Sequence, residues 1–309
     1  MKKNNPRFIF IIGNRGSGKS RLAEQIISNL GDDAVLIAAD EVHSEVLGFD
    51  EAVRQVSEKG RIDFPKEVQS EGTKIVNKLL LGSIDKQKNI VLDASFGQNH
   101  FKFMEQLKNI GYSIEVHGLI IDKYLAAYNV EKRTLDFFDL CMDVKNGIKP
   151  KPTKFNAIDV GYKVPLMTDD KIVEIIDNVE KHGVDLFLYE YGKNIPSYVS
   201  GKNSEGAVEF YKSKQSADYC LLHLNLLKLN QRCQKYGRDI APLVFMVGKE
   251  VTIKGAEMAL RAPNFDKYME SVFFEDASKE NIKNKFVPRK LGMPAKLKVK
   301  IGRGKRYGR

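Results

Sequence analysis

Short runs of apolar residues alternate, along the first 194 residues, with longer segments whose apolar positions recur every three or four residues. The short runs predict buried strands, and the longer segments predict amphipathic helices. The expected strands are 7–12, 34–40, 89–95, 113–122 and 184–192. The expected helices are 19–30, 66–81, 98–110, 123–138 and 171–183. This alternation predicts an α/β fold with a parallel sheet and helices on both faces.

The alternation stops near residue 195. Residues 195–215 are rich in Gly, Ser, Asn and Pro, which predicts a linker or a long loop. Residues 216–236 predict an apolar helix with one buried stripe, formed by Leu222, Leu226, Leu229 and Cys233. A hairpin is expected at 243–253. The predicted division is therefore an α/β domain at 1–194, a mainly helical C-terminal extension at 195–280 and a basic tail at 281–309.

Charge sets the tail apart from the rest of the chain. The net charge is +10, and residues 281–309 contain 11 Lys or Arg and no acid. Such a tail suits nucleic acid or an anionic membrane surface, and a merely solvated arm is the alternative. The three cysteines are too widely spaced for a zinc or disulfide framework. The apolar runs are too short to cross a membrane and no export signal is evident, so a cytoplasmic protein is expected.

A glycine-rich phrase, GNRGSGKS at 13–20, follows the first predicted strand and opens the first predicted helix. It matches the phosphate-binding pattern G-x-x-x-x-G-K-[ST] in the strand–loop–helix context that this pattern requires. The expected nucleotide-binding residues are Gly13, Asn14, Arg15, Gly16, Ser17, Gly18, Lys19 and Ser20. Backbone N–H groups would surround the phosphates of ATP, Lys19 would reach the β- and γ-phosphates, and Ser20 would bind Mg²⁺.

An acid, Asp40, lies at the end of the second predicted strand and indicates that the phosphate acceptor is an alcohol. Phosphoryl transfer to an alcohol needs a carboxylate near the hydroxyl proton, and a helix N-cap is the alternative role for this residue. The guanine-reading phrase N-K-x-D of GTPases is missing from the sequence. The strand that ends at Asp93 continues with Ala94, not with the second acid expected of helicases and ring ATPases.

Three stretches resemble the bacterial zeta toxins. They are LIAADEVHSEVLGFDEA at 36–52, NIVLDASFGQ at 89–98 and GYSIEVHGLIIDKYLAAYNVEKR at 111–133. The resemblance extends over about residues 5–193, and phage polynucleotide kinase and other small-molecule kinases share the broader architecture. It implies a P-loop kinase-like fold and a kinase that phosphorylates a hydroxyl of a nucleotide-type small molecule, similar to UDP-N-acetylglucosamine or NAD.

The resemblance also implies roles for individual residues. Asp40 would take the hydroxyl proton of the substrate, and Arg133 would contact the triphosphate during transfer. The implied substrate-binding residues are Glu71, Asp93 and Ser95, where the family more often has Glu and Thr at the last two positions. The second arginine of the family lid is not found, and residues 144–158 offer lysines in its place, among them Lys151.

Two other functions remain open. A polynucleotide or RNA 5′-hydroxyl kinase would use the same chemical centre with the basic tail on the strand. A non-catalytic nucleotide-binding interaction module would dock through residues 195–309. Zeta toxins also imply an antitoxin protein as a partner, and relatives among bacterial effectors imply that the protein could be delivered into another cell.

Overall fold

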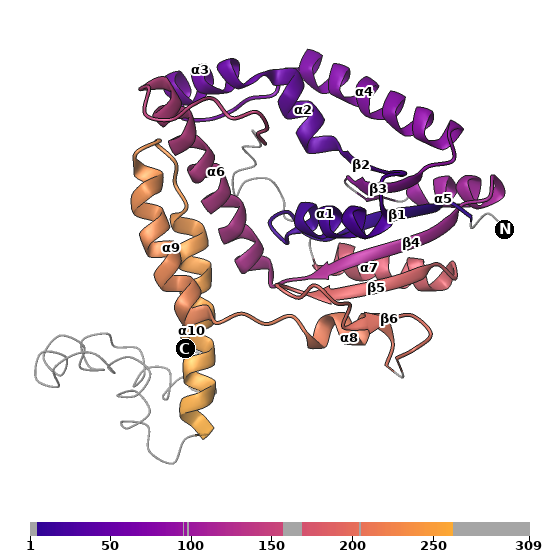
Figure 1. Cartoon of the computed structure of the whole chain (residues 1–309). Helices are drawn as coiled ribbons and strands as arrows, with labels where there is room; N and C mark the ends of the chain where they lie inside the picture. The colour runs from indigo at the N-terminus through magenta and orange to yellow at the C-terminus, as the bar shows by residue number, and fades with distance from the viewer. Residues whose placement is uncertain (1–4, 95, 98, 157–168, 204, 262–309) are drawn as a thin grey trace, which may run out of the picture. The chain divides into compact units, whose positions relative to one another are not determined.

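The computed structural model describes residues 5–261 except for 95, 98, 157–168 and 204 (Figure 1). The predicted basic tail and Ser95 therefore lie outside the described residues. The chain divides into two compact units, Met1–Val244 and Phe245–Arg309, and the architecture below is that of the first unit. No helix among the described residues is long and apolar enough to cross a membrane.

A six-stranded sheet forms the centre of the first unit, with the order β2-β3-β1-β4-β5-β6. The strands are β1 Arg7–Ile12, β2 Ala34–Ala38, β3 Asn89–Asp93, β4 Ser113–Ile120, β5 Asp185–Glu190 and β6 Tyr198–Val199. Every neighbouring pair is parallel except β5 with β6, which is antiparallel. The predicted strands and their parallel arrangement are confirmed.

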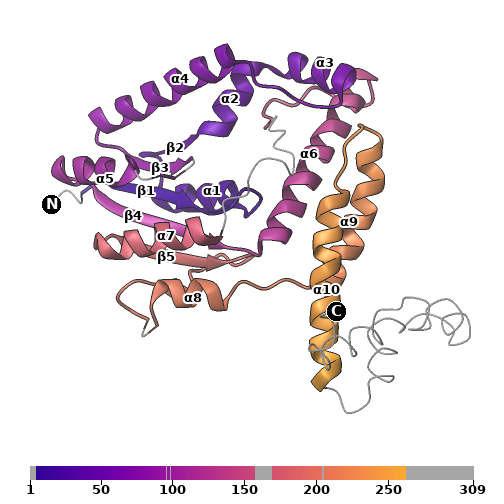
Figure 2. The ribbon, with the colours of Figure 1, turned by 180° about the vertical axis from the view of Figure 1, so that it is seen from behind.

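The helices are α1 Lys19–Leu30, α2 Ala39–Leu47, α3 Phe49–Lys59, α4 Lys66–Asp85, α5 Asn99–Asn109, α6 Lys123–Lys145, α7 Asp169–Lys181, α8 Ala207–Ser213, α9 Tyr219–Gln234 and α10 Ala241–Arg261. Successive residues of a strand point to opposite faces, so β1 directs Phe8, Phe10 and Ile12 towards α4, α5, α7 and α8. Ile9 and Ile11 face α1 on the other side. Both faces are covered, as predicted (Figures 1 and 2).

A second apolar cluster lies between α2, α3 and α6. Phe49 from α3 meets Phe137 from α6 edge-on, with 6.1 Å between the ring centroids. Phe155, from the segment after α6, stacks on Phe137 and packs edge-on against Phe49. Helices α2 and α3 were not among the helices predicted from the sequence. Gly48, with φ 81°, ends the first and begins the second.

Two predictions for the C-terminal part are wrong. The hairpin expected at 243–253 is part of helix α10, whose buried Leu243 and Val247 are four residues apart. That spacing is typical of a helix. The run LVFMV is too short for its sequence pattern to distinguish a strand from a helix. The stretch 195–215 is not a plain loop, because it forms β6 and α8. The predicted helix at 216–236 is confirmed as α9, with its four stripe residues buried.

One acid of α7 links this helix to strand β6 and to the start of helix α8. Glu180 accepts hydrogen bonds from the Tyr198 hydroxyl at 2.8 Å and from the backbone N–H of Ala207 at 3.3 Å. Residues beyond 194 thus pack on the elements that precede them within Met1–Val244. The domain boundaries at 194 and 280 stay predictions.

A polar network is buried on the α1 face of the sheet. Glu115 on β4 accepts two hydrogen bonds from the Arg7 guanidinium, both at 2.6 Å, and its Oε2 lies 3.0 Å from His117 Nε2. The other ring nitrogen of His117 lies 2.9 Å from the Tyr189 hydroxyl. Burial opposes the negative charge, but the hydrogen bonds from His117 and Arg7 outweigh it and lower the pKa of Glu115 to about 2.

Because of this network, the stability of the fold depends on pH in the acid range. Since the folded pKa of Glu115 lies below its ordinary 4.5, its contribution is complete above pH 4.5 and is lost as the pH falls towards 2. The free energy of unfolding of Glu115→Gln, measured with urea, is expected to be lower at pH 7 by on the order of 3 kcal/mol. The difference from wild type should shrink at acid pH. The exposed control Glu105→Gln should show no such change, and an equal loss at pH 7 and pH 3 would contradict the linkage.

Candidate functional site

The phosphate-binding pattern forms a tight loop between β1 and α1. Three of its glycines have positive φ, with Gly16 at 77°. A Cβ on Gly16 would lie only 2.2 Å from the carbonyl oxygen of Ala126 on α6, so the loop and this helix meet backbone to backbone. Gly18 is the N-cap of α1 and gives no side-chain hydrogen bond there. The first N–H groups of α1 are therefore left to an anion, together with the positive end of the helix dipole.

Gly16→Ala tests this close approach. The added methyl group requires a shift of the loop or of α6, and alanine is strained at φ 77°. We expect nucleotide affinity, measured by calorimetry with an ATP analogue, to fall by about tenfold or more. Gly82→Ala is the control, because a Cβ on Gly82 within α4 meets nothing within 4 Å. Unchanged affinity in Gly16→Ala would show that the loop does not bind the nucleotide.

Lys19 lies across the mouth of the loop. Its Nζ donates hydrogen bonds to the backbone carbonyls of Gly13 and Asn14, both at 3.1 Å. Burial lowers the pKa of Lys19, while the nearby carboxylates Asp93 and Asp40 act in the opposite direction. The side chain of Asn14 is fully buried, and its contact with Lys19 is made by the backbone carbonyl. An ammonium held in this way is ready to exchange two carbonyls for phosphate oxygens.

Ser20 and Asp93 meet beside Lys19. The Ser20 hydroxyl, in the first turn of α1, donates to Asp93 Oδ2 at 2.9 Å from the end of β3. Burial raises the pKa of Asp93, opposed mainly by the Lys19 charge and this hydrogen bond. The register explains the meeting, because Asp93 lies beside Ile11 of β1 and Ala38 of β2. The carboxyl ends of these parallel strands bring distant parts of the sequence to one edge.

Asp40 and Arg133 complete the charged centre. Asp40 lies in the first turn of α2 with its side chain exposed, and the N-cap position belongs to Ala38. Arg133 projects from α6 and is open to solvent, yet the protein around its guanidinium lowers its pKa, with the Asp40 carboxylate opposing this effect. Both side chains line the same cavity as Lys19, Ser20 and Asp93. Two acids, two cations and a hydroxyl therefore converge from four elements.

The cavity has a volume of about 530 Å³, a size typical of small-ligand sites. Its wall also contains residues that the sequence did not point to, namely Arg21, Leu22, Gln25, Leu119, Asn129, Tyr191, Gly192, Lys193 and Asn194. Asn129 of α6 donates to the Gly16 carbonyl at 2.9 Å and to the Tyr191 hydroxyl at 3.1 Å. Gln25 of α1 donates to the Asn194 carbonyl at 2.7 Å. The position of 191–194 directly after β5 is the one sequence signal that could have identified this turn.

Other predicted site residues lie elsewhere. Glu71 is exposed on α4, is paired with Lys74 at 3.4 Å and is not among the residues that line the cavity. Lys151 also lies outside that lining and forms an ion pair with Asp50 at 2.9 Å. Two other lysines of the predicted lid are engaged too. Lys145 donates to Ser57, and Lys149 pairs with Asp143 at 2.7 Å. The last two residues of that segment, 157–158, lie outside the described residues.

The fold and this cavity define a P-loop kinase-like protein. Residues 1–137 match the family model described as "Zeta toxin". The resemblance noted in the sequence is thereby confirmed. The comparison with curated proteins finds no match.

Two of the solved structures that are similar to the chain illustrate the likeness. One comes from the PezAT chromosomal toxin–antitoxin system of Streptococcus pneumoniae, with a TM-score of 0.54 and 15% identity, covering 76% of this chain and 87% of that one. This likeness supports the fold. The other is a protein of Chloroflexus aurantiacus provisionally described as a kinase, with 12% identity and a TM-score of 0.35, covering 69% of this chain and 100% of that one. The second score is too low to carry an argument.

Proposed function

We propose that the protein is an ATP-dependent kinase that transfers the γ-phosphate to a hydroxyl of a nucleotide-type small molecule, similar to UDP-N-acetylglucosamine or NAD. The observation that carries the proposal is the shared cavity of Lys19, Asp40 and Arg133 beside a loop of backbone N–H groups. Phosphoryl transfer needs these parts: a phosphate cradle, a carboxylate for the acceptor hydroxyl and cations for the developing charge. The match of residues 1–137 to the zeta toxin family supports the same chemistry.

The site also fits magnesium. Mg²⁺ prefers oxygen ligands and is bound by one or two protein groups together with phosphate oxygens and water. The Ser20 hydroxyl and the Asp93 carboxylate are such oxygens, 2.9 Å apart at the start of α1. In this proposal Ser20 would hold the ion directly and Asp93 would orient it. Mg²⁺ would neutralise charge on the β- and γ-phosphates. The substrate-binding role of Asp93 stays a prediction.

The proposed transfer step uses the carboxylate of Asp40 and the cations of Lys19 and Arg133. Asp40 accepts the proton of the acceptor hydroxyl, and the oxygen of that hydroxyl forms the new bond to the γ-phosphorus. The bond from the γ-phosphorus to the oxygen that bridges it to the β-phosphate breaks, and ADP leaves with that electron pair. Lys19 and Arg133 balance the charge that gathers on the transferring and leaving oxygens. Glu71 and Lys151 have no step in this scheme.

The acceptor is tested by incubating the full chain with isotopically labelled ATP, Mg²⁺ and defined acceptors, including UDP-N-acetylglucosamine, NAD and a 5′-hydroxyl oligonucleotide. Mass spectrometry is expected to find a nucleotide-type product that is heavier by one labelled phosphate. A labelled oligonucleotide end with no labelled small molecule would favour the polynucleotide kinase. Tight ATP binding without any labelled product would favour the non-catalytic module.

A protein partner is a further part of the proposal. The similar Streptococcus pneumoniae structure comes from a toxin–antitoxin system, and an antitoxin of this chain would keep the kinase inactive until it is removed. Native mass spectrometry of the protein isolated from the cells that produce it is expected to show a complex with a second chain. Isolation of the chain alone, already active, would contradict this part and leave the kinase proposal intact.

A further inference from the structure

Helix α6 is the element that joins the phosphate-binding loop to the charged centre. Its backbone meets Gly16, its Asn129 donates to the Gly16 carbonyl, and its Arg133 enters the cavity. A small shift of α6 would therefore move the loop contact and the guanidinium together. The question is what holds α6 in place on the side away from the cavity.

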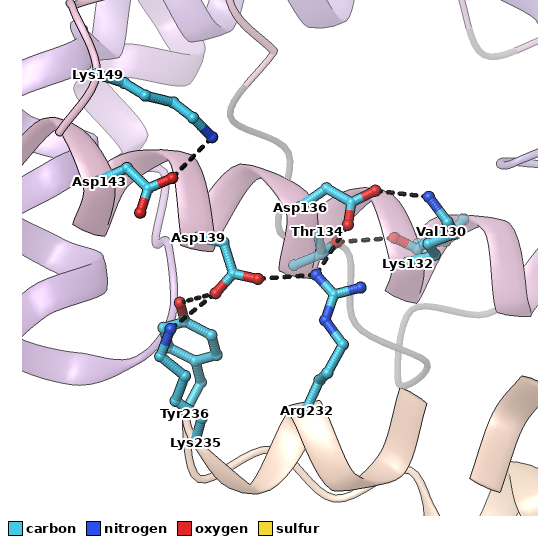
Figure 3. A network of polar contacts seen from close by, with 10 residues as sticks. All are labelled: Val130, Lys132, Thr134, Asp136, Asp139, Asp143, Lys149, Arg232, Lys235 and Tyr236. Carbon is cyan, nitrogen blue, oxygen red and sulfur yellow. Dashed lines mark hydrogen bonds and ion pairs between the residues drawn. The ribbon is translucent and has the colours of Figure 1, made fainter. Parts of the chain in front are cut away.

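Helix α9, beyond residues 1–137 that match the family, packs along α6. At the start of α6 the Tyr219 hydroxyl donates to the capping carboxylate of Asp122 at 2.6 Å. Further along, Arg232 of α9 lies between Asp136 and Asp139 and donates to both at 2.8 Å (Figure 3). Asp139 also accepts from Lys235 at 2.9 Å and from the Tyr236 hydroxyl at 2.6 Å (Figure 3). The two helices are thus linked at several positions along α6.

The remaining link is buried. Glu131 of α6, two residues before Arg133, has no exposed side-chain surface, and its Oε2 accepts from Arg238 at 2.9 Å. The guanidinium of Arg238, whose side chain is 13% exposed, also lies over the Phe138 ring at 5.6 Å. A buried carboxylate needs such a partner, because an unpaired charge in the interior is strongly disfavoured. The pair therefore fixes the middle of α6, next to the cavity arginine.

A defined turn directs Arg238 back to α6. The N–H of Gly237 bonds to the Gln234 carbonyl at 3.1 Å, and the N–H of Arg238 bonds to the Cys233 carbonyl at 3.1 Å. With φ 63° at Gly237, these bonds form the glycine-ended helix terminus known as a Schellman motif. A Cβ on Gly60, at the end of α3, would lie 2.5 Å from the Tyr236 carbonyl oxygen, so this turn also rests on α3. Its position is set by two helices.

We propose that α9 is a brace for α6, and that Arg238 is a positioning residue that holds Arg133 at the cavity through its buried pair with Glu131. The proposal rests on the kinase function argued above for its catalytic readout. Its structural content, the dependence of α6 on Arg238, is separate and is measured without catalysis.

The first test is hydrogen exchange of the full chain, comparing wild type with Arg238→Ala. If α9 braces α6, the amides of residues 126–134 should exchange about tenfold faster or more, a change equal to 1.4 kcal/mol of local opening. The amides of β1 and β3 should not change. Lys228→Ala is the control, since Lys228 is an exposed cation of α9. Unchanged exchange in α6 for a folded Arg238→Ala would overturn the proposal.

The second test asks whether Arg238 acts through Arg133. At a temperature well below unfolding, Arg238→Ala should lower kcat about 10- to 100-fold, as expected for a misplaced catalytic group, with a smaller change in the KM for ATP. In the Arg133→Ala background the same substitution should have almost no further effect on kcat. A merely structural role predicts independent effects that multiply, and that result would overturn the positioning role.

Two other results are possible, namely that Arg238→Ala does not fold or that the wild-type chain is inactive. If Arg238→Ala does not fold, Glu131→Gln with Arg238→Met replaces it in both tests, because this pair leaves no unpaired buried charge. If the wild-type chain transfers no phosphate to any acceptor, the kinase proposal fails, and the exchange measurement alone then supports or overturns the brace.

Discussion

Asp40→Asn is expected to lower kcat for phosphoryl transfer by about 10²- to 10⁴-fold, the range that a general base contributes. Asparagine keeps the size of the side chain but cannot accept the hydroxyl proton. Because Asp40 is exposed in the first turn of α2, the fold should tolerate the change. ATP affinity should change little, since the proposal assigns the phosphates to Lys19 and the loop. The measurement is the initial rate with labelled ATP and the acceptor identified by mass spectrometry, together with calorimetry of an ATP analogue.

Asp50→Asn is the matched control for this experiment. Asp50 is also an exposed acid near the start of a helix, but its partner is Lys151 and it lies outside the cavity lining. Its loss should leave kcat within about twofold, because an isolated exposed ion pair contributes little. Wild-type turnover in Asp40→Asn would remove the carboxylate from the mechanism. The kinase proposal would then have to find another base among the cavity residues.

The difference between Asp40 and Lys151 shows what the sequence can reveal about this site. Asp40 and Asp93 each follow an apolar run, and the carboxyl ends of parallel strands meet at one edge, so their meeting could be predicted. Lys151 was chosen for its charge alone, and nothing local indicates that Asp50, 101 residues earlier, accepts its hydrogen bond. Charge in a loop specifies a partner only after the fold has brought one near.

The same reasoning explains the residues that were missed. Asn129 lies within a predicted helix, and its contact with Gly16 depends on the backbone approach of the loop to α6. Helix α10 was mistaken for a hairpin because a short apolar run fits either period. The brace of α9 on α6 joins residues 93 to 107 positions apart, such as Asp139 with Arg232 and Glu131 with Arg238. Pairings at that separation are set by tertiary packing, which one sequence does not display.

Arg133→Ala is expected to lower kcat by about 10³-fold, because an arginine on the transferring phosphate contributes that much or more. Arg133 and Asp40 line the same cavity, and the Asp40 carboxylate acts to raise the pKa of the guanidinium; in the proposed mechanism the transferring group lies beside both. Since the interaction strengthens as charge moves to the leaving oxygen, the loss should appear in kcat more than in the KM for ATP. Arg133→Lys should recover only part of the rate, because a lysine lacks the planar fork.

Lys132→Ala is the control for the arginine, since this neighbouring cation of α6 is exposed and pairs with Asp136 at 2.7 Å. Its rate should stay close to that of wild type. Asp40→Asn and Arg133→Ala should also be combined, because two groups that act on the same transition state give effects that do not simply multiply. A combined variant whose loss equals the product of the two single losses would show that the acid and the arginine act independently, and their proposed action as one unit on the transferring group would be wrong.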